Sequence, residues 1–288
     1  MVDVVTLQNG TLGAAVSACG AELQRLHTAA GEELLWDGNP DVWAGRSPLL
    51  FPVVGNVKDD RITVRGQHYP LLRHGFARTS TFELVEASST RCTWRLRAND
   101  ETRARYPFAF QLDVTYALDG ARLTISATIA NDGAEPMPAS FGFHPAFRWP
   151  LVPGVAREDH DVRFGEPEPE PIRRLAGGLL GGPEATPVAG DRLALADALF
   201  QRDALIFDRL RSRRLTYGPA TGRRLELEFP ALPHLGIWSK PGAGFVCLEP
   251  WQGFASPVDF DGELAEKPGI VAIPPHSERL FELSVTIL

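Results

Sequence analysis

The sequence is poor in sulfur: its 288 residues include three cysteines and two methionines. Cys19, Cys92 and Cys247 are odd in number and far apart, which fits reduced thiols in a cytoplasmic protein better than a disulfide framework. The seven histidines form no pair at the short spacing of a structural zinc site. We therefore expect no disulfide and no bound metal.

Long apolar runs and an excess of basic residues are also missing. No run of about 18 apolar residues exists, so no membrane-spanning helix is expected. The first ten residues, MVDVVTLQNG, lack the basic and apolar regions of a secretory signal. A net charge of −7 and a pI near 5.5 make nucleic acid an unfavourable partner. The sequence has neither a G-x-x-x-x-G-K phosphate loop nor a G-x-S-x-G nucleophile motif.

Glycine and proline are abundant, with 27 and 24 residues, while the hydrophobic fraction of 44% is ordinary. Many turns between short strands explain such a composition. Polar and apolar residues alternate strictly in the segments 108–116, 121–131, 223–229 and 281–287. Alternation with period two predicts strands with one buried face, and Asp119-Gly120 predicts a hairpin over 108–129. We predict an all-β fold: a large antiparallel β-sandwich of roughly 15 to 20 strands in one domain, residues 1–288.

Three segments stand outside this pattern. Asp100 is expected to cap a single helical turn that runs to Arg105, and 41–47 is a second candidate turn. Residues 150–191, with repeated glycine and proline, are expected to form a long irregular excursion. No βαβ rhythm is visible, which argues against a parallel α/β fold.

Polar residues gather in segments punctuated by glycine and proline. Glu249 is the most unusual, because it follows the apolar run 245–248 and an unpaired buried carboxylate is costly. His144 lies among phenylalanines, where a histidine is more often a satisfied core residue than a catalyst. His74 could simply occupy a turn, and Arg46 could extend along the surface.

Taken together and in order, these segments resemble the aldose 1-epimerase (galactose mutarotase-like) family over essentially the whole chain. The segments are GRSPLLFPVVGN (45–56), RHGFAR (73–78), GFHPAF (142–147), DALIF (203–207) and CLEPWQG (247–253). Their form resembles a bacterial branch often found near sugar-utilisation genes. The resemblance implies a β-supersandwich with a sugar site on a concave sheet face.

The resemblance also implies roles for individual residues. His144 matches the general acid and Glu249 the general base. Arg46, His74 and Asp203 match sugar-binding residues. Trp238 or Trp251 could pack on the sugar ring or serve only as core.

The implied reaction interconverts the α and β anomers of a hexose. A base takes the proton of the C1 hydroxyl, an acid protonates the ring oxygen, and the opened sugar recloses on the other face. An acid–base pair suffices for this chemistry, so no cofactor is expected. Carboxylates beside His144 would favour its imidazolium form, which predicts an activity limit on the alkaline side.

Several alternatives stay open at this level. Phe143 and Pro145 flank His144, unlike the best-known galactose mutarotases, so the sugar itself is undecided. A hexose 6-phosphate is also a possible substrate, because basic residues lie near the motifs: Arg73, Arg78 and Lys240. A non-catalytic carbohydrate-binding protein on the same fold would need no acid–base pair, and a glycoside hydrolase would use two carboxylates, such as Asp203 and Glu249. The expected partner is a small sugar, and the protein could be a monomer or a homodimer.

Overall fold

The computed structural model describes residues 3–288, and its strands, numbered β1 to β24, all pair antiparallel. The nine-stranded sheet contains, in spatial order, β17 (Arg192–Ala194), β14 (His160–Phe164), β19 (Arg214–Pro219), β20 (Leu225–Glu228), β24 (Glu278–Ile287), β10 (Arg122–Asn131), β9 (Phe110–Asp119), β8 (Arg91–Arg97) and β7 (Glu83–Ala87). The expected all-β antiparallel fold is confirmed, with more strands than expected.

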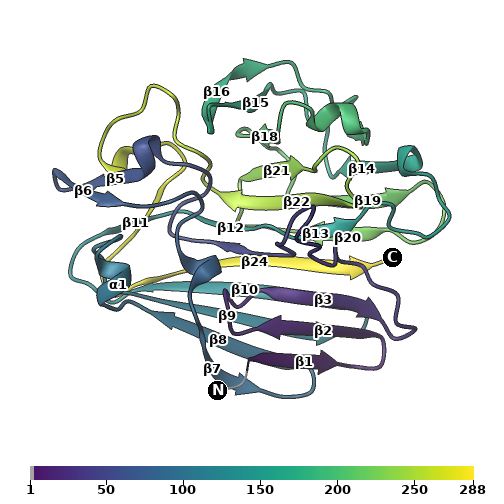
Figure 1. Cartoon of the computed structure of the whole chain (residues 1–288), viewed down its shortest axis with the longest axis horizontal. Coiled ribbons are helices and arrows are strands. Elements are labelled where there is room, and N and C mark those ends of the chain that lie inside the picture. The colour runs from purple at the N-terminus through teal and green to yellow at the C-terminus, as the bar shows by residue number, and fades with distance from the viewer. Residues whose placement is uncertain (1–2) are drawn as a thin grey trace.

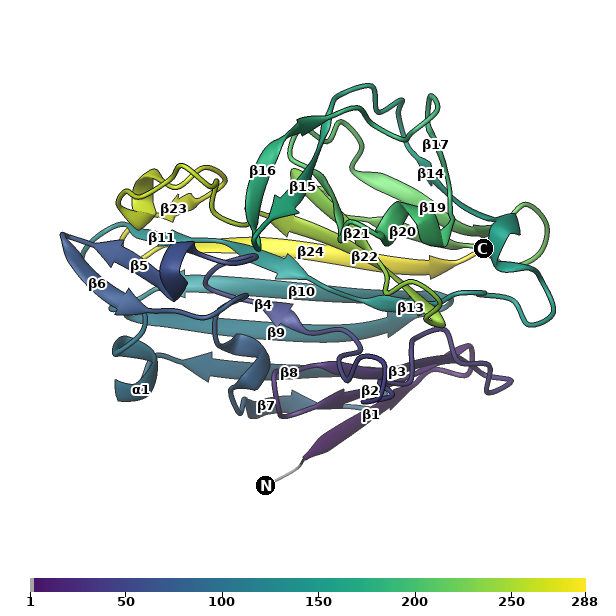
Figure 2. The ribbon, with the colours of Figure 1, turned by 45° about the horizontal axis from the view of Figure 1, so that its top comes forward.

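A second large sheet carries the candidate site. Its eight strands run in the order β16 (Leu179–Glu184), β15 (Ile172–Ala176), β18 (Leu205–Phe207), β21 (His234–Trp238), β22 (Phe245–Gln252), β12 (Phe141–Phe143) and β4 (Leu49–Leu50), with β13 (Ala146–Arg148) also paired to β22. Figures 1 and 2 show β21 and β22 beside the long strands of the first sheet, and the β15–β16 hairpin standing above them.

Smaller elements complete the described structure. A three-stranded sheet is formed by β1 (Val4–Gln8), β2 (Leu12–Ser17) and β3 (Leu23–Thr28), and β1 contacts β8 and β9. Two-stranded pairs join β5 (Arg61–Val64) to β6 (Gln67–Pro70) and β11 (Met137–Ala139) to β23 (Val271–Ile273). Helix is confined to α1 (Asp100–Arg103) and short 3₁₀ turns at 58–60, 77–79, 157–159, 197–200 and 264–266. Within residues 3–288, no helix has both the length and the apolar character needed to cross a membrane.

The strictly alternating segments form the centre of the first sheet. In β9 and β10 every second side chain is buried, and Asp119 pairs with Arg122 across the tight turn. The expected hairpin is thus confirmed. Its buried residues belong to a hydrophobic core that extends from Val5 to Val285.

Buried tyrosines connect the layers. The Tyr116 hydroxyl of β9 donates to the Ala21 carbonyl at 2.6 Å, and the Tyr217 hydroxyl of β19 donates to the Arg148 carbonyl of β13 at 2.6 Å. Each ring fills the core while its hydroxyl satisfies a backbone oxygen outside its own sheet, in the β2–β3 turn for Tyr116 and in β13 for Tyr217. Polar groups therefore fix how the sheets sit on one another.

Three local expectations are corrected. The cap of α1 is Asn99, whose Oδ1 accepts from the Thr102 N–H at 2.9 Å. No helix forms over 41–47, where the chain makes turns. The segment 150–191 is not simply irregular, because it contains β14, β15 and β16.

Candidate active site

The strand register places His144 opposite Glu249. Gly142 of β12 pairs with Trp251 of β22, and Ala146 of β13 pairs with Cys247. His144 lies midway between these two pairs, as Glu249 does on β22. The neighbouring prolines, Pro145 and Pro250, have no N–H to donate, so the ladder is interrupted there while its register continues.

The two side chains meet at short range in a buried place. His144 Nε2 lies 3.0 Å from Glu249 Oε2, and the side chains are 8% and 2% exposed. Burial lowers the pKa of His144, because it disfavours the imidazolium. Burial also raises the pKa of Glu249 well above its usual value, an effect that Arg73 opposes and Asp203 reinforces. Burial therefore favours a neutral pair that holds one proton between Nε2 and Oε2.

His74 is held in a strained loop. Its φ is +66°. The next residue is Gly75, whose φ of +68° and close approach to the Phe51 carbonyl both require the absence of a Cβ. The His74 N–H donates to the Gly55 carbonyl at 2.9 Å, and the Gly55 N–H returns a bond to His74 Nδ1 at 3.1 Å. This reciprocal pair fixes the imidazole at the edge of the cavity.

Both ring nitrogens of His74 face a hydrogen-bond donor. Burial and the nearby charges lower the pKa of His74 well below its usual value, so the ring is neutral. The Gly55 N–H points to Nδ1 at 3.1 Å and Arg73 Nε points to Nε2 at 3.0 Å. A neutral imidazole carries one proton, so it can accept only one of these two hydrogen bonds at a time.

Aromatic rings enclose the His144 imidazole. Trp43 is stacked on it, with centroids 5.2 Å apart, and Trp238 meets it edge-on at 6.1 Å. On the other side of Glu249, the Trp251 indole lies across Gly142 and Gly236, where a Cβ would collide with the ring. These rings provide flat apolar walls on which a sugar ring can pack.

Asp203 lies on the side of the site that β18 forms. It precedes β18 with φ +66°, and its Oδ1 accepts from the Ala204 N–H at 2.7 Å. Arg174 of the β15–β16 hairpin holds the Asp203 carbonyl at 2.7 Å. The hairpin therefore supports the site, and its Leu175 lines the cavity.

One cavity of about 410 Å³ unites these groups, a volume within the roughly 300–1,000 Å³ of small-molecule sites. Of the residues expected from the sequence, it contains His74, His144, Asp203, Trp238, Glu249 and Trp251. Trp43, Asn56, Leu175 and Ile206 line it without having been singled out. Asn56 does lie in the segment 45–56, but Leu175 belongs to the segment expected to be irregular.

Arg46 is the expected site residue that the structure places elsewhere. Its guanidinium packs over Gly38, and its Nη1 donates to Gln24. The Arg46 and Ser47 N–H groups donate to Glu22 Oε1 at 2.8 and 2.9 Å. Arg46 is thus committed to joining its loop to the β2–β3 region, and it does not line the cavity.

Two arginines, Arg73 and Arg78, line the same cavity without a carboxylate partner among residues 3–288. Arg78 Nη2 donates to the Arg73 carbonyl at 3.0 Å, while its buried Nε has no hydrogen-bond partner. Burial, followed by the charge of Arg73, lowers the pKa of Arg78. Lys240, by contrast, donates to the Val42 carbonyl and does not line the cavity.

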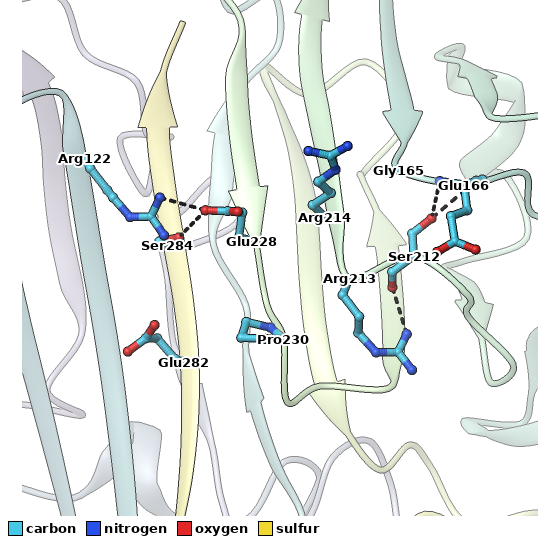
Figure 3. A pocket seen from close by; sticks show the side chains of 10 residues that line it. All are labelled: Arg122, Gly165, Glu166, Ser212, Arg213, Arg214, Glu228, Pro230, Glu282 and Ser284. Atoms are coloured by element: carbon cyan, nitrogen blue, oxygen red, sulfur yellow. Dashed lines mark hydrogen bonds and ion pairs between the residues drawn. The ribbon is translucent and has the colours of Figure 1, made fainter.

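A second cavity of about 390 Å³ lies on the solvent face of the nine-stranded sheet (Figure 3). Two of its charged residues are paired, since Arg122 contacts Glu228 at 2.7 Å, and Ser284 donates to the same carboxylate at 3.5 Å. It holds no histidine. The cavity of His144 and Glu249, by contrast, brings an imidazole and a carboxylate together.

One group of potential metal ligands occurs in the part of the chain that the structure describes. His144, Cys247 and Glu249 bring their ligand atoms within 4.8 Å of one another, and all three are buried. The spacing of histidines in the sequence could not reveal this group, because its members meet only through strand pairing.

The fold and this site define a class of β-sandwich protein with a buried acid–base pair at a sugar-sized cavity. Residues 3–164 match the family model for aldose 1-epimerase. The chain is 32% identical over 296 residues to the plasmid-encoded protein LacX of Lactococcus lactis subsp. lactis, covering 99% of each. The chain belongs to the aldose 1-epimerase family.

Solved structures agree with this assignment. A galactose mutarotase related enzyme from Lactobacillus acidophilus superimposes with a TM-score of 0.91 at 32% identity, covering 99% of this chain and 97% of that one. A galactose mutarotase-like protein from Lactobacillus casei gives a TM-score of 0.91 at 28% identity, with coverage of 99% and 100%. The expected galactose mutarotase-like fold is confirmed.

Proposed function

We propose that the protein is an aldose 1-epimerase that interconverts the anomers of a hexose, with Glu249 as general base and His144 as general acid. The observation that carries this proposal is the His144–Glu249 pair, 3.0 Å apart on the wall of the cavity. A protein that only binds sugar has no need to bury an acid and a base against each other. Desolvating both groups is costly, so a chemical use explains their burial better than binding alone.

The reaction needs one proton to leave the C1 hydroxyl and one proton to reach the ring oxygen. With the sugar bound, the Glu249 carboxylate takes the proton of the C1 hydroxyl while the His144 imidazolium protonates the ring oxygen. The bond from C1 to the ring oxygen breaks and C1 becomes a carbonyl. After rotation about C1–C2 the ring oxygen attacks the other face, and both protons return. The catalytic form differs from the neutral pair only by transfer of one proton from Oε2 to Nε2.

The surrounding groups orient the sugar. The His74 ring and the Arg73 guanidinium contact sugar oxygens, whereas the Asp203 carboxylate accepts hydrogen bonds from sugar hydroxyls. Trp43, Trp238 and Trp251 cover apolar ring faces. These residues act by binding, so their loss should raise KM more than it lowers kcat.

The direct test follows the optical rotation of freshly dissolved α-glucose and α-galactose. Glu249→Gln and His144→Asn should each reduce the enzymatic rate by at least about 100-fold, because one proton transfer is removed. Glu166→Gln and His68→Asn are matched controls, since both residues are exposed and lie outside the cavity. Full activity in the Glu249→Gln, His144→Asn double variant would refute the assigned roles.

A second candidate substrate is a sugar that carries an anion, such as a hexose 6-phosphate. The specific observation is Arg73 with Arg78, two guanidiniums at the cavity with no carboxylate bonded to either within residues 3–288. A phosphate would relieve their mutual repulsion and accept charge-assisted hydrogen bonds.

Anomer exchange measured by NMR on glucose and glucose 6-phosphate separates the two candidates. If the phosphosugar is the substrate, Arg73→Gln should raise its KM by about 10- to 100-fold, the value of one charge-assisted hydrogen bond. The effect on free glucose should be much smaller. Equal effects on both sugars would eliminate the anionic substrate while leaving the epimerase reaction intact.

A further inference from the structure

A cysteine lies beside the acid–base pair that the proposed reaction does not use. Cys247 and Glu249 are two residues apart on β22, so their side chains lie on the same face of the strand. The register puts Ala146 and Trp238 opposite Cys247, and His144 beyond Ala146 opposite Glu249. As a result the Cys247 Sγ, His144 Nε2 and a Glu249 oxygen fall within 4.8 Å of one another.

The three donor types define which cation would fit. A thiolate, an imidazole and a carboxylate are the ligands of Zn²⁺, with bonds of about 2.0–2.3 Å, whereas Mg²⁺ and Ca²⁺ require oxygen ligands. In four-coordinate geometry such bonds need ligand atoms about 3.3–3.8 Å apart. Nε2 and Oε2 are 3.0 Å apart, and all three ligand atoms lie within 4.8 Å of one another, so side-chain shifts of about 1 Å would give these separations.

The net charge of the bound ligand set matters, because the thiol lies in an apolar cluster. Cys247 packs with Ala146, Trp43 and Trp238, where a net charge is costly. Zn²⁺ with a thiolate, a carboxylate and a neutral imidazole has no net charge. Binding displaces the thiol proton and the proton shared by the pair, and both go to solvent.

We propose that His144, Cys247 and Glu249 form a Zn²⁺ site whose occupation blocks sugar isomerisation. Three protein ligands leave the fourth position open, and it faces the cavity that His144 and Glu249 line. The metal takes up the Nε2 lone pair and the Oε2 charge that the reaction uses. The inhibitory part of this proposal rests on the proposed function, whereas the binding site itself does not.

The binding test uses Cys19→Ala as the parent, because the exposed Cys19 thiol could capture metal on its own. Zinc chloride is titrated against a chromophoric chelator, and Co²⁺ serves as a spectroscopic probe. The parent should bind one equivalent, and Co²⁺ should give a thiolate-to-metal charge-transfer band. Adding Cys247→Ala should weaken binding by more than about tenfold and remove the band.

Matched variants make the result decisive. Cys92→Ala removes another buried thiol that is not part of the cluster, and it should leave binding and the band unchanged. Cys247→Ser preserves the size of the side chain, so it replaces Cys247→Ala if that variant fails to fold by circular dichroism. Retention of stoichiometric binding without the Cys247 thiol, or a Co²⁺ complex with no charge-transfer band, would overturn the site.

The activity measurement is kept separate. If the parent isomerises a sugar, Zn²⁺ should inhibit it, and the Cys247 variant should need more than about tenfold more zinc for the same loss relative to its own metal-free rate. Thiol-dependent binding to a chain without isomerase activity would refute the proposed function and keep the site. Activity that persists with one zinc bound would refute the inhibition.

Discussion

At the scale of single residues, the important feature is that His144 and Glu249 are buried together. Burial disfavours the imidazolium and the carboxylate separately. The pair can nevertheless remain neutral overall by holding one proton. Adding a second proton creates a buried cation, and removing the last creates a buried anion. The pair with one shared proton, which the proposed reaction uses, therefore persists at pH values both below and above neutrality.

This protection predicts an unusually flat pH dependence. Protonation of the pair follows the lowered pKa of His144, so the acid limb should fall well below the 6.5 of an ordinary histidine. Loss of the pair's proton follows the raised pKa of Glu249, so the alkaline limb should also lie away from neutrality. The test measures kcat/KM for mutarotation between about pH 5 and 8, a range that spans the ordinary histidine pKa of about 6.5. An inflection near 6.5 would show that His144 titrates as a solvated group and would contradict this prediction.

The sequence revealed those candidate residues whose position follows from local chain geometry. His144 and Glu249 lie in motif segments next to strands, and both reach the cavity. Arg46 lies in an equally distinctive segment, yet its guanidinium bonds Gln24. Which direction a long side chain takes depends on partners distant in the sequence, such as Glu22 and Gln24. That information is absent from a motif.

At the scale of elements, β21 and β22 show how a small residue shapes the site. Gly236 of β21 pairs with Glu249, and the Trp251 indole lies over the place where a Cβ would be. The neighbouring β18 places Ile206 beside the same glycine. The glycine thus lets a large ring lie flat against the sheet, where it forms one wall of the cavity.

Gly236→Ala should therefore displace Trp251 toward the cavity. We expect a loss of about 1–3 kcal/mol in the free energy of unfolding, typical of overpacking, and a rise in the KM for sugar. Urea unfolding and steady-state mutarotation measure the two effects. Gly182→Ala in β16 is the control, because an added Cβ there meets no atom within 4 Å. An unchanged KM in Gly236→Ala would argue against Trp251 as a sugar-packing wall.

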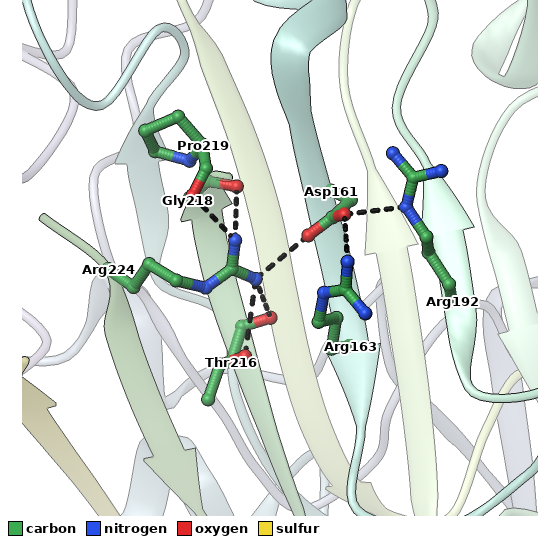
Figure 4. A network of polar contacts seen from close by, with 7 residues as sticks. All are labelled: Asp161, Arg163, Arg192, Thr216, Gly218, Pro219 and Arg224. Carbon is green, nitrogen blue, oxygen red and sulfur yellow. Dashed lines mark hydrogen bonds and ion pairs between the residues drawn. The ribbon is translucent and has the colours of Figure 1, made fainter. Parts of the chain in front are cut away.

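A second element-scale feature ties β14, β17 and β19 of the nine-stranded sheet to Arg224, the residue before β20 (Figure 4). The buried Asp161 of β14 accepts from Arg192 at 2.6 Å and from Arg224 at 2.8 Å, with Arg163 3.4 Å away. Arg224 also donates to the Gly218 and Pro219 carbonyls at 2.8 Å. Burial alone would raise the pKa of Asp161, but the hydrogen bonds from the arginines together lower it.

Asp161→Asn should leave three arginines without their common counter-ion. The expected loss is about 3–5 kcal/mol in the free energy of unfolding, as for one partner removed from a buried pair. Because the folded-state pKa is depressed, the parent has this stability above the unfolded pKa near 3.9 and loses it as pH falls through the folded pKa. Chemical unfolding at pH 7 and near pH 3 should show the difference between parent and variant shrinking in acid. An equal difference at both values would exclude an ionic origin.

The segment 150–191 marks the limit of element prediction from sequence. Its glycines and prolines indicate turns, and turns are present, but β15 and β16 pair with a bulge between Arg173 and Leu175. A broken alternation gives a weak strand signal. The hairpin is stabilised instead by distant partners, since Arg173 contacts Asp208 at 3.0 Å and Leu180 N–H donates to the Ser256 carbonyl at 2.8 Å.

At the scale of the whole molecule, strand order is what assembles the site. The C-terminal β24 lies between β10 and β20, and β22 lies between β12 and β21. Alternation identifies such strands individually but gives no information about which distant strand each one pairs with. Composition and alternation were enough to predict the fold class, and the motif segments were enough to predict the family. The register that sets His144 against Glu249 emerged only from the assembled sheets.

The same packing buries Lys267, a side chain that is usually exposed and positively charged. Lys267 is 3% exposed, and its Nζ donates to the Phe254 and Pro268 carbonyls with no carboxylate partner among residues 3–288. Burial lowers its pKa to about 7. Between that value and the roughly 10.4 of an unfolded lysine, the unfolded chain binds the extra proton, so this group makes folding more favourable as pH rises.

Lys267→Met should consequently stabilise the protein at pH 6.5 and lose that advantage at pH 9.5. At the lower pH the folded parent holds a desolvated ammonium, and an apolar side chain of similar length removes this cost, a gain of about 1–4 kcal/mol less the two carbonyl bonds. At the higher pH the folded parent is already neutral. Urea unfolding at both values measures the change, with Lys58→Met as control because Lys58 is part-exposed and contacts Asp261 at 3.3 Å. A stabilisation that does not depend on pH would attribute the effect to packing and would contradict a buried, titrating Lys267.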